Sequence, residues 1–420
     1  MKLTPSRARG SVLIVAMVVL FALAGLVLTL NRSARVDLAL SANTQASHDA
    51  DLIARGAEQY VLAILTDYRD SLDDMLETDF TNVPLGGGTF SIVKPNYDDG
   101  SLPAWGLMDE STKLNLNSAT VDQLRILPGM TDELSAGIVD WRDVDDDVTA
   151  SGSESANYLG QADGYRAKNA NFEAVEELML IKGMTPELLY GPPSMTGIVV
   201  GDYYQQHGLA DFFTVWSREA NTAADGTARV NINTQRTETR NLLRDKINEA
   251  RAGEIVNRVG VSPAGDVFDY AFRGGITYDE LRLIDDYITD AFPNTPVQGR
   301  INVNTAPREV LLTLNISESD VDALLARRTS EVQANPGSRA WVYDVLKEKS
   351  RGLGRRITGR GRQYSADIIA SSRNGRAFKR VRIVVDTTPT TLRIVYRRDI
   401  TDRGRPAVLD AQVPVQGARR

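Results

Sequence analysis

An uncharged apolar run at residues 11–30, SVLIVAMVVLFALAGLVLTL, follows the short basic leader MKLTPSRARG. At about 1.5 Å of rise per residue, roughly 20 apolar residues cover the roughly 30 Å hydrocarbon core of a bilayer. A secretory signal peptide has a shorter apolar core and a small-residue cleavage site behind it. Here the run is longer and is followed by NRSAR at residues 31–35. We therefore expect a retained membrane-spanning helix at residues 11–30.

The composition narrows the function classes. The chain of 420 residues contains no cysteine and only two histidines, His48 and His207. Thiol catalysis and cysteine-ligated zinc are excluded, and a Ser-His-Asp triad or a multi-histidine metal site is disfavoured. The net charge of −7 conceals an asymmetry, because residues 339–420 hold 20 basic and 7 acidic residues. Residues 1–338 are therefore strongly acidic, which argues against nucleic acid as a partner of that part of the chain.

Helical periodicity continues beyond the apolar run. Apolar residues recur at helical spacing from Val36 to Leu76, and the first proline after the run is Pro84. This pattern predicts either one stem helix from about Ser11 to Leu76 or a membrane helix followed by a separate amphipathic helix. Gly25 and Gly56 are positions at which a kink or break is compatible with the sequence.

Four segments read as strands. A short strand is predicted at residues 89–93, and three more at 364–370, 378–385 and 391–396, the last three joined by Asn374-Gly375 and by TTPT at residues 387–390. Val381, Ile383 and Val385 alternate with other side chains along one strand. This pattern predicts that one face of the strand packs on the stem helix and that a basic face, with Arg380 and Arg382, is turned outward. About 270 residues separate the first strand from the second. A large insertion within one sheet is the economical interpretation.

The intervening region contains an internal repeat. KLNLNSA at residues 113–119 recurs as RVNINT at 229–234 and as RINVNTA at 300–306, and each copy leads into a helical pattern. The second asparagine of each copy, or the Ser or Thr after it, is predicted to cap the following helix. We read residues 105–330 as a mostly helical region assembled from small bundles.

An acidic run follows the first repeat. Oxygen-bearing side chains fall at positions 1, 3, 5, 7, 9 and 12 of residues 143–154, the spacing of a twelve-residue calcium loop. Val148 replaces the glycine that such loops carry at position six, so ligands borrowed from outside the loop are expected. A solvated acidic turn remains the alternative. The candidate ligands are Asp140, Asp143, Asp145, Asp146, Asp147, Glu154 and Asn169.

Two other function classes are compatible with parts of the sequence. The segment NLNSA…LPGM…IVDWR resembles a helix-hairpin-helix module, as found in membrane-anchored DNA receptors of competence and type IV pilus systems. Its hairpins read Gly-Met-Thr at 129–131 and 183–185 and so lack the second glycine that lets a phosphate approach, and acidic residues follow the first. A membrane-anchored hydrolase is the other class, but the acidic cluster offers no activated nucleophile. We expect no enzymatic activity, no catalytic residues and no nucleic-acid partner.

A family resemblance agrees with these patterns. The leader resembles those of type IV prepilins and type II secretion pseudopilins, which a prepilin peptidase cuts after a glycine, here between Gly10 and Ser11. The fifth residue after that junction is Val15, where most members have Glu, a departure typical of the K-type minor pseudopilin. DE…KLNLN at residues 109–117, VDWRDVDD at 139–146, YRAKN at 165–169 and KGMTPEL at 182–188 are similar to the same K type, the GspK family.

The resemblance implies an architecture and a role. It implies an α+β fold in which a long membrane-spanning stem helix packs on an antiparallel pilin-like sheet with a large helical, SAM-like insertion. The implied role is a subunit that joins I- and J-type partners at the tip of the secretion pseudopilus. The implied location is the bacterial inner membrane, with a cytoplasmic N-terminus and a periplasmic head. Some members bind calcium in the insertion.

The expected segments are a leader at 1–10, a membrane helix at 11–30, the stem and first strand at 31–104, the insertion at 105–330, the C-terminal sheet at 331–403 and a tail at 404–420.

Overall fold

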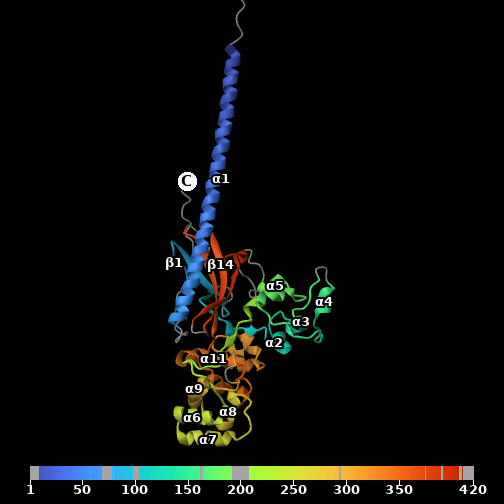
Figure 1. Ribbon diagram of the computed structural model, residues 1–420, viewed down its shortest axis with the longest axis vertical. Helices are drawn as coiled ribbons and strands as arrows, with labels where there is room; N and C mark the ends of the chain where they lie inside the picture. The colour runs from blue at the N-terminus through green and yellow to red at the C-terminus, as the bar shows by residue number, and fades with distance from the viewer. Residues whose placement is uncertain are drawn as a thin grey trace, which may run out of the picture.

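A single long helix dominates the computed structural model, which describes residues 9–405 except 69–77, 79, 98–103, 161–163, 192–207, 293–294, 374 and 389–390, together with Leu409. Helix α1 runs without interruption over Arg9–Asp67, 59 residues, or about 90 Å at about 1.5 Å per residue. Figure 1 shows it, in blue, projecting far beyond the rest of the protein. The single-stem interpretation is therefore confirmed. The helix ends at Asp67, before the predicted end near Leu76, and residues 69–77 lie outside the described part of the chain.

The two halves of α1 have different surroundings. Large apolar side chains from Leu13 to Leu40 are exposed, whereas Ala54, Ala57, Val61 and Leu65 are fully buried. Exposed apolar side chains on a helix of this length are stable only in an apolar medium or against another protein. Gly56 does not break the helix. Its position brings the stem close to Leu85, whose Cδ2 atom would lie 2.7 Å from an added Cβ.

The stem packs on an antiparallel sheet of seven strands. The order is β1-β2-β13-β14-β15, with β3 beside β2 and β4 beside β13. Strands β2 and β13 are neighbours, with Ile92 opposite Ile368, although the insertion separates them in sequence. The four strands predicted from the sequence are confirmed with small changes in their ends. The bounds are β1 (Val83–Leu85), β2 (Gly88–Lys94), β3 (Ala104–Trp105), β4 (Met108–Asp109), β13 (Gln363–Ser371), β14 (Phe378–Asp386) and β15 (Arg393–Asp399).

The predicted alternation in β14 is also confirmed. Val381, Ile383 and Val385 are fully buried and belong to the same cluster as the stem residues Ala57 and Val61. Burying each such aliphatic side chain contributes roughly 1.5–3 kcal/mol. The small alanines on the stem let the helix lie close to the sheet. This core therefore fixes the stem on one face of the sheet.

The other face of the sheet is not a free basic surface, contrary to our prediction. Arg380 forms two hydrogen bonds to the Asp367 carboxylate, at 2.8 and 2.7 Å, and Arg382 lies 3.7 Å from the same group. Arg398 and Arg403 of the C-terminal segment pair instead with Glu176 of the insertion, at 3.2 and 3.4 Å. The basic residues are thus partly neutralised within the chain itself.

The insertion consists of three units, each opened by one copy of the repeat. In each unit the strand of the repeat pairs in parallel with a strand near the end of the same unit. The pairs are β5 (Leu114–Asn115) with β6 (Phe213–Thr214), β8 (Val230–Asn231) with β9 (Ile288–Thr289), and β11 (Ile301–Asn302) with β12 (Ile357–Thr358). The first unit is displaced to one side in Figure 1, whereas helices α6 to α9 of the second form the end of the molecule opposite the stem.

Short helices fill the three units. The first unit holds α2 (Val121–Arg125), α3 (Asp132–Arg142), α4 (Ser155–Leu159), η3 (Val175–Leu180), α5 (Pro186–Tyr190) and η5 (Leu209–Asp211). The second holds α6 (Arg236–Lys246), α7 (Glu249–Val259), α8 (Val267–Gly274), α9 (Tyr278–Ile284) and η6 (Asp285–Tyr287). The third holds α10 (Arg308–Leu312), α11 (Glu318–Ala334), α12 (Ala340–Leu346) and η7 (Lys347–Ser350). Turn η2 (Glu110–Thr112) lies at the start of the insertion, and η8 (Thr401–Arg403) follows β15. Strand β7 (Arg218–Glu219) pairs with β10 (Val297–Gln298).

The repeated asparagines do not cap the helices, contrary to our prediction. The N-cap residues are Thr120 for α2, Gln235 for α6 and Pro307 for α10. The first asparagine of each copy instead accepts a hydrogen bond from the backbone N–H two residues later. The bonds are Asn117 N to Asn115 Oδ1 (2.8 Å), Asn233 N to Asn231 Oδ1 (2.9 Å) and Asn304 N to Asn302 Oδ1 (3.0 Å).

The second asparagine ties the turn to a distant loop of its own unit. Asn117 donates to the Phe172 carbonyl at 3.0 Å and accepts from the Phe172 N–H at 2.7 Å. Asn233 makes the same pair of bonds with Ala264, at 3.0 and 2.8 Å. Asn304 donates to the Ser338 and Gly359 carbonyls and accepts from Trp341 Nε1. A side-chain amide satisfies both a donor and an acceptor of a buried loop, so the repeat is explained by hydrogen bonding.

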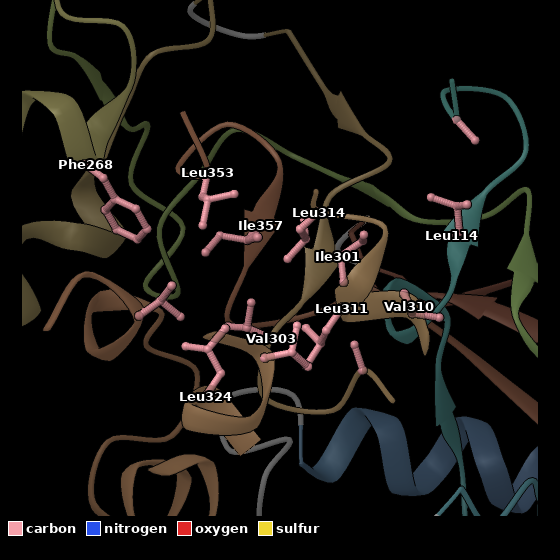
Figure 2. Close-up of a cluster of buried hydrophobic side chains, with 14 of the residues drawn as sticks. Leu114, Phe268, Ile301, Val303, Val310, Leu311, Leu314, Leu324, Leu353 and Ile357 are labelled. Atoms are coloured by element: carbon pink, nitrogen blue, oxygen red, sulfur yellow. The ribbon is translucent and has the colours of Figure 1, made fainter. Parts of the chain in front are cut away.

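The helical core extends further along the chain than expected. Residue 330 lies inside α11, and Leu353 and Ile357 belong to the core of the insertion. Figure 2 shows these two side chains beside Ile301 and Val303, with Phe268 of the second unit nearby. We place the end of the insertion after β12, near residue 358, instead of at residue 330.

Candidate metal centre

Helix α3 positions the first acidic side chain. Thr131 begins the helix by accepting a hydrogen bond from the Leu134 N–H, and the helix ends at Arg142. Asp140, in its last turn, has no exposed surface. Asp143 is the C-cap residue, and Glu154 is the N-cap residue of α4. The two short helices thus bring carboxylates 14 residues apart in sequence to one place.

Three carboxylates meet at this point. Each of Asp140, Asp143 and Glu154 offers an oxygen, and these oxygens all lie within 4.8 Å of one another. Asp140 is held by the Thr149 N–H, at 3.2 and 3.3 Å from its two oxygens. Both Glu154 oxygens and Asp143 Oδ1 are buried, and none has a hydrogen-bond partner among the described residues. Buried carboxylates are normally paired, hydrogen-bonded or bound to a metal.

The side-chain amide of Asn169 lies against the acidic loop and offers a further candidate ligand oxygen. Asn169 adopts a left-handed conformation, with φ of 48°, and its N–H donates to the Trp141 carbonyl at 3.0 Å. Its Nδ2 atom donates to the Asp145 carbonyl and to Asp146 Oδ1, at 3.0 and 3.1 Å. These bonds commit the amide nitrogen, while Oδ1 is buried and lacks a partner within the described chain.

The electrostatics of the cluster disfavour its charged form. Burial, with the Asp140 and Asp143 charges, raises the pKa of Glu154 to about 7. Burial, with the Asp145 and Asp140 charges, also raises the pKa of Asp143. Like charges this close repel unless a cation neutralises them. The unpaired oxygens and the raised pKa values both fit a divalent cation with a preference for oxygen ligands.

The candidate ligands divide into two groups. Asp140, Asp143, Glu154 and Asn169 supply the buried oxygens, whereas Asp145, Asp146 and Asp147 are exposed. Asp145 accepts a hydrogen bond from the Asp147 N–H at 3.0 Å, so these two residues shape the loop. Thr149, at loop position seven, contributes an N–H to Asp140. The buried oxygens therefore combine two loop residues, Asp143 and Glu154, with two residues from outside the loop, Asp140 and Asn169.

Some supporting residues carried no clear signal in the sequence. Gly152 packs against Asp140, because an added Cβ would lie 2.0 Å from Asp140 Oδ2. Trp141 packs edge-on against Tyr158, with ring centroids 5.4 Å apart, and Tyr158 stacks on Tyr165 at 5.3 Å. In the sequence, Gly152 between two serines indicates only a turn, and the aromatic residues indicate only a hydrophobic core. Their role in shaping the site depends on tertiary contacts.

The hairpins that resembled a DNA-binding module have a structural explanation. Gly129 and Gly183 adopt positive φ values of 76° and 89°. The threonines that replace the second glycine, Thr131 and Thr185, are the N-caps of α3 and α5. The DNA-binding alternative is therefore not favoured.

The predicted processing site lies at the edge of the described residues. Gly10 is in the first turn of α1, and the leader before Arg9 lies outside the described part of the chain. The helix from Leu13 onward contains a window with a mean hydropathy of 3.0 and is the one described helix that is long and apolar enough to cross a membrane.

Comparison with known families bears on the first unit. Residues 107–190 match the family described as type II secretion system (T2SS), protein K. The chain carries a protein K domain. The domain spans β4 to α5 and so includes the whole acidic cluster, and it confirms the resemblance to K-type pseudopilins seen in the sequence. With the apolar helix ahead of it, this is a membrane-anchored protein with an α+β fold.

Similarity to individual proteins is more distant. No curated protein matches the chain. Among solved structures, one similar chain belongs to the GspK-GspI-GspJ complex of the type 2 secretion system from enterotoxigenic Escherichia coli. It is 12% identical, with a TM-score of 0.46, and the match covers 86% of this chain and 98% of that one. That likeness is too distant to transfer residue roles to the protein K domain described above.

Proposed function

We propose that this protein is a minor pseudopilin that caps the tip of a type II secretion pseudopilus together with I- and J-type subunits. The observation that carries the proposal is the protein K domain, set between strands of a sheet that packs on a long, half-exposed stem helix. Such a subunit acts through contacts and promotes export across the outer membrane. It sits in the bacterial inner membrane, with its N-terminus in the cytoplasm and its head in the periplasm.

The stem supports the place at the tip. Fibre assembly needs an apolar stem that leaves the lipid and packs against other stems, and the exposed apolar side chains of α1 suit that transfer. Val15 replaces the carboxylate with which other subunits pair to a neighbour above them. A subunit without that group suits the position that has no neighbour above it.

Processing and assembly can be tested separately. In cells with prepilin peptidase, mass spectrometry of the purified protein should give a mature N-terminus at Ser11, and Gly10→Leu should block cleavage. The full chain should also co-purify with I- and J-type subunits from the same genome. A mature start near residue 31, or no co-purification with these subunits, would contradict the proposal.

We also propose that the protein is not an enzyme. Among the described residues, the acidic cluster has no adjacent nucleophile with an activating base, and His48, which lies in the stem, is not part of it. Turnover of an ester, glycoside or phosphate substrate that Asp143→Ala abolished would overturn this.

We propose further that the acidic cluster holds calcium. Asp140, Asp143, Glu154 and Asn169 would supply the protein oxygens, and the cation would neutralise the carboxylates and hold α3, α4 and the 143–154 loop together. Gly152→Ala tests the geometry, because its Cβ would displace the Asp140 carboxylate. We expect calorimetry to show at least about a tenfold loss of calcium affinity, which corresponds to about 1.4 kcal/mol.

A matched glycine controls for the substitution itself. Gly160, at the end of α4, has ordinary backbone angles, and its added Cβ would meet nothing closer than 3.8 Å. Gly160→Ala should therefore bind calcium like the parent protein. Absence of calcium heat in the parent protein would sink the proposal.

A further inference from the structure

A cavity of about 510 Å³ lies at the seam between the sheet and the third unit of the insertion. Its size falls within the range of about 300–1,000 Å³ that is typical of ligand pockets. The sheet contributes residues from the ends of β2 and β4 and the start of β13. The insertion contributes the third Asn-x-Asn turn and one face of α11.

Hydrogen bonds join the two sides of the cavity across the seam. Asn302 donates to Asp109 Oδ2 at 2.6 Å, and the hydroxyls of Thr112 and Thr305 lie 2.7 Å apart. The second Asp109 oxygen accepts from the Ser111 N–H at 2.8 Å. Gly361 packs against the same carboxylate, since an added Cβ would lie 1.8 Å from Asp109 Oδ1. Both Asp109 oxygens are thus engaged, one of them in a bond that joins the two halves, and Glu309 is the second carboxylate that lines the cavity.

The basic groups in the wall, which are Lys94, Arg308, Arg328 and Arg360, differ in their partners. Arg308 pairs with Glu318 and Asp322, at 3.0 and 3.2 Å, and Arg328 donates to the Ala306 carbonyl at 2.6 Å. Within the described chain, the Lys94 ammonium has no carboxylate in ion-pair range, and its burial lowers its pKa. An ammonium that is partly withdrawn from water and lacks a counter-ion favours an anion beside it.

The rest of the wall is mainly apolar. Leu107 and Met108 line it from the sheet side, and Leu325 and Val332 of α11 line it from the insertion side. A ligand that fills it gains from burial of apolar area and from one or two placed charges.

We propose that this cavity binds a carboxylate carried on an apolar body, with Lys94 supplying the counter-charge. The carboxylate could belong to a free organic acid or to the C-terminus of a peptide with apolar last residues. The proposal does not depend on the role at the pseudopilus tip.

The test uses the full chain in lipid nanodiscs, with empty nanodiscs as the blank. One arm measures binding of 4-phenylbutyrate and of its neutral amide by calorimetry. The second arm measures acetyl-Ala-Ala-Ala-Phe-Leu with a free C-terminal carboxylate and with an amidated one. In at least one arm the acid should bind at least about tenfold tighter than the amide, the effect of one charge-assisted hydrogen bond.

Two variants tie the binding to the cavity. Lys94→Met should remove the preference for the acid, and Leu325→Trp should weaken both forms by filling the space. Lys349→Met is the matched control, because that lysine is 66% exposed, pairs with Asp320 and does not line the cavity. The arm that shows the preference identifies the source of the carboxylate. Equal binding of acid and amide in both arms, no binding in either, or an unchanged preference in Lys94→Met overturns the proposal.

Discussion

At the residue scale, the acidic cluster couples protonation to stability. Burial and the neighbouring carboxylates raise the pKa of Glu154 in the folded protein to about 7, from an ordinary value of 4.5. Below about pH 4.5 the carboxyl is protonated in both the folded and the unfolded chain. As the pH rises toward 7, the unfolded chain ionises first, so the cation-free fold loses stability, and above about pH 7 the loss is complete. The loss is on the order of a few kcal/mol.

Glu154→Gln should remove this pH dependence. In EDTA, the melting temperature of the parent protein should fall between about pH 4.5 and 7, and that of the variant should fall less. At pH 7.5 in EDTA the variant should melt higher than the parent. Asp147→Asn, which changes an exposed residue of the same loop, is the control and should follow the parent. Identical pH curves for parent and Glu154→Gln would contradict the assignment.

The sequence predicted this site in outline because oxygen-bearing side chains recur along the chain at a ligand spacing. It did not separate Asp143 from Asp145, since both fall at odd positions of the loop, and only their burial distinguishes them. The contribution of Gly152 could not be predicted either. It depends on a close approach to Asp140, a residue 12 positions away.

At the element scale, local periodicity predicted the stem and strands well, and hydrogen bonding across loops was missed. Strand alternation in residues 381–385 depends on neighbours two residues apart, which are visible in the sequence. The asparagine repeat was also interpreted as a local feature, a cap on the helix that follows it. Its second asparagine instead reaches residues 31 to 55 positions away in the chain. Only the folded unit brings those partners together.

Asn233→Ala should destabilise the second unit. The change removes the bonds of the side chain to both the carbonyl and the N–H of Ala264, and leaves part-buried backbone groups without partners. We expect a loss of about 2 kcal/mol in the free energy of unfolding, measured by denaturant titration. Asn241→Ala, which removes a side chain from the exposed face of α6, should cost less than about 0.5 kcal/mol. Equal losses in the two variants would refute the role given to the repeat.

At the scale of the whole molecule, ion pairs and an aromatic contact dock the first unit on the edge of the sheet. Glu176 of η3 accepts from the Tyr396 hydroxyl at 3.2 Å and pairs with Arg398 and Arg403. Trp216 packs beside Tyr396, with ring centroids 5.8 Å apart. The sequence predicted only that the basic face of the C-terminal sheet is turned outward. The acidic partner of Arg398 and Arg403 belongs to the same chain and lies more than 200 positions away, so no local pattern contains this pairing.

Glu176→Ala should loosen this docking without unfolding the unit. Hydrogen exchange should rise in β15 and η3, while α3 stays protected, because the core of the unit does not include Glu176. Raising the salt concentration should reproduce part of the effect in the parent protein, since the pairs are partly exposed. Glu173→Ala, which changes an 87% exposed side chain nearby, serves as the control. Unchanged exchange in β15 would show that the pairs do not hold the unit in place.

The insertion leaves and rejoins the sheet at one point. Strand β4 leads into it and β13 follows it, and the two are paired side by side, with Asp109 opposite Tyr364. A tensile load along the stem would therefore pass from α1 into the sheet through their shared core, and would bypass the three helical units. The three units would lie outside the path of the force and would keep their ligands and contacts while the stem is under tension.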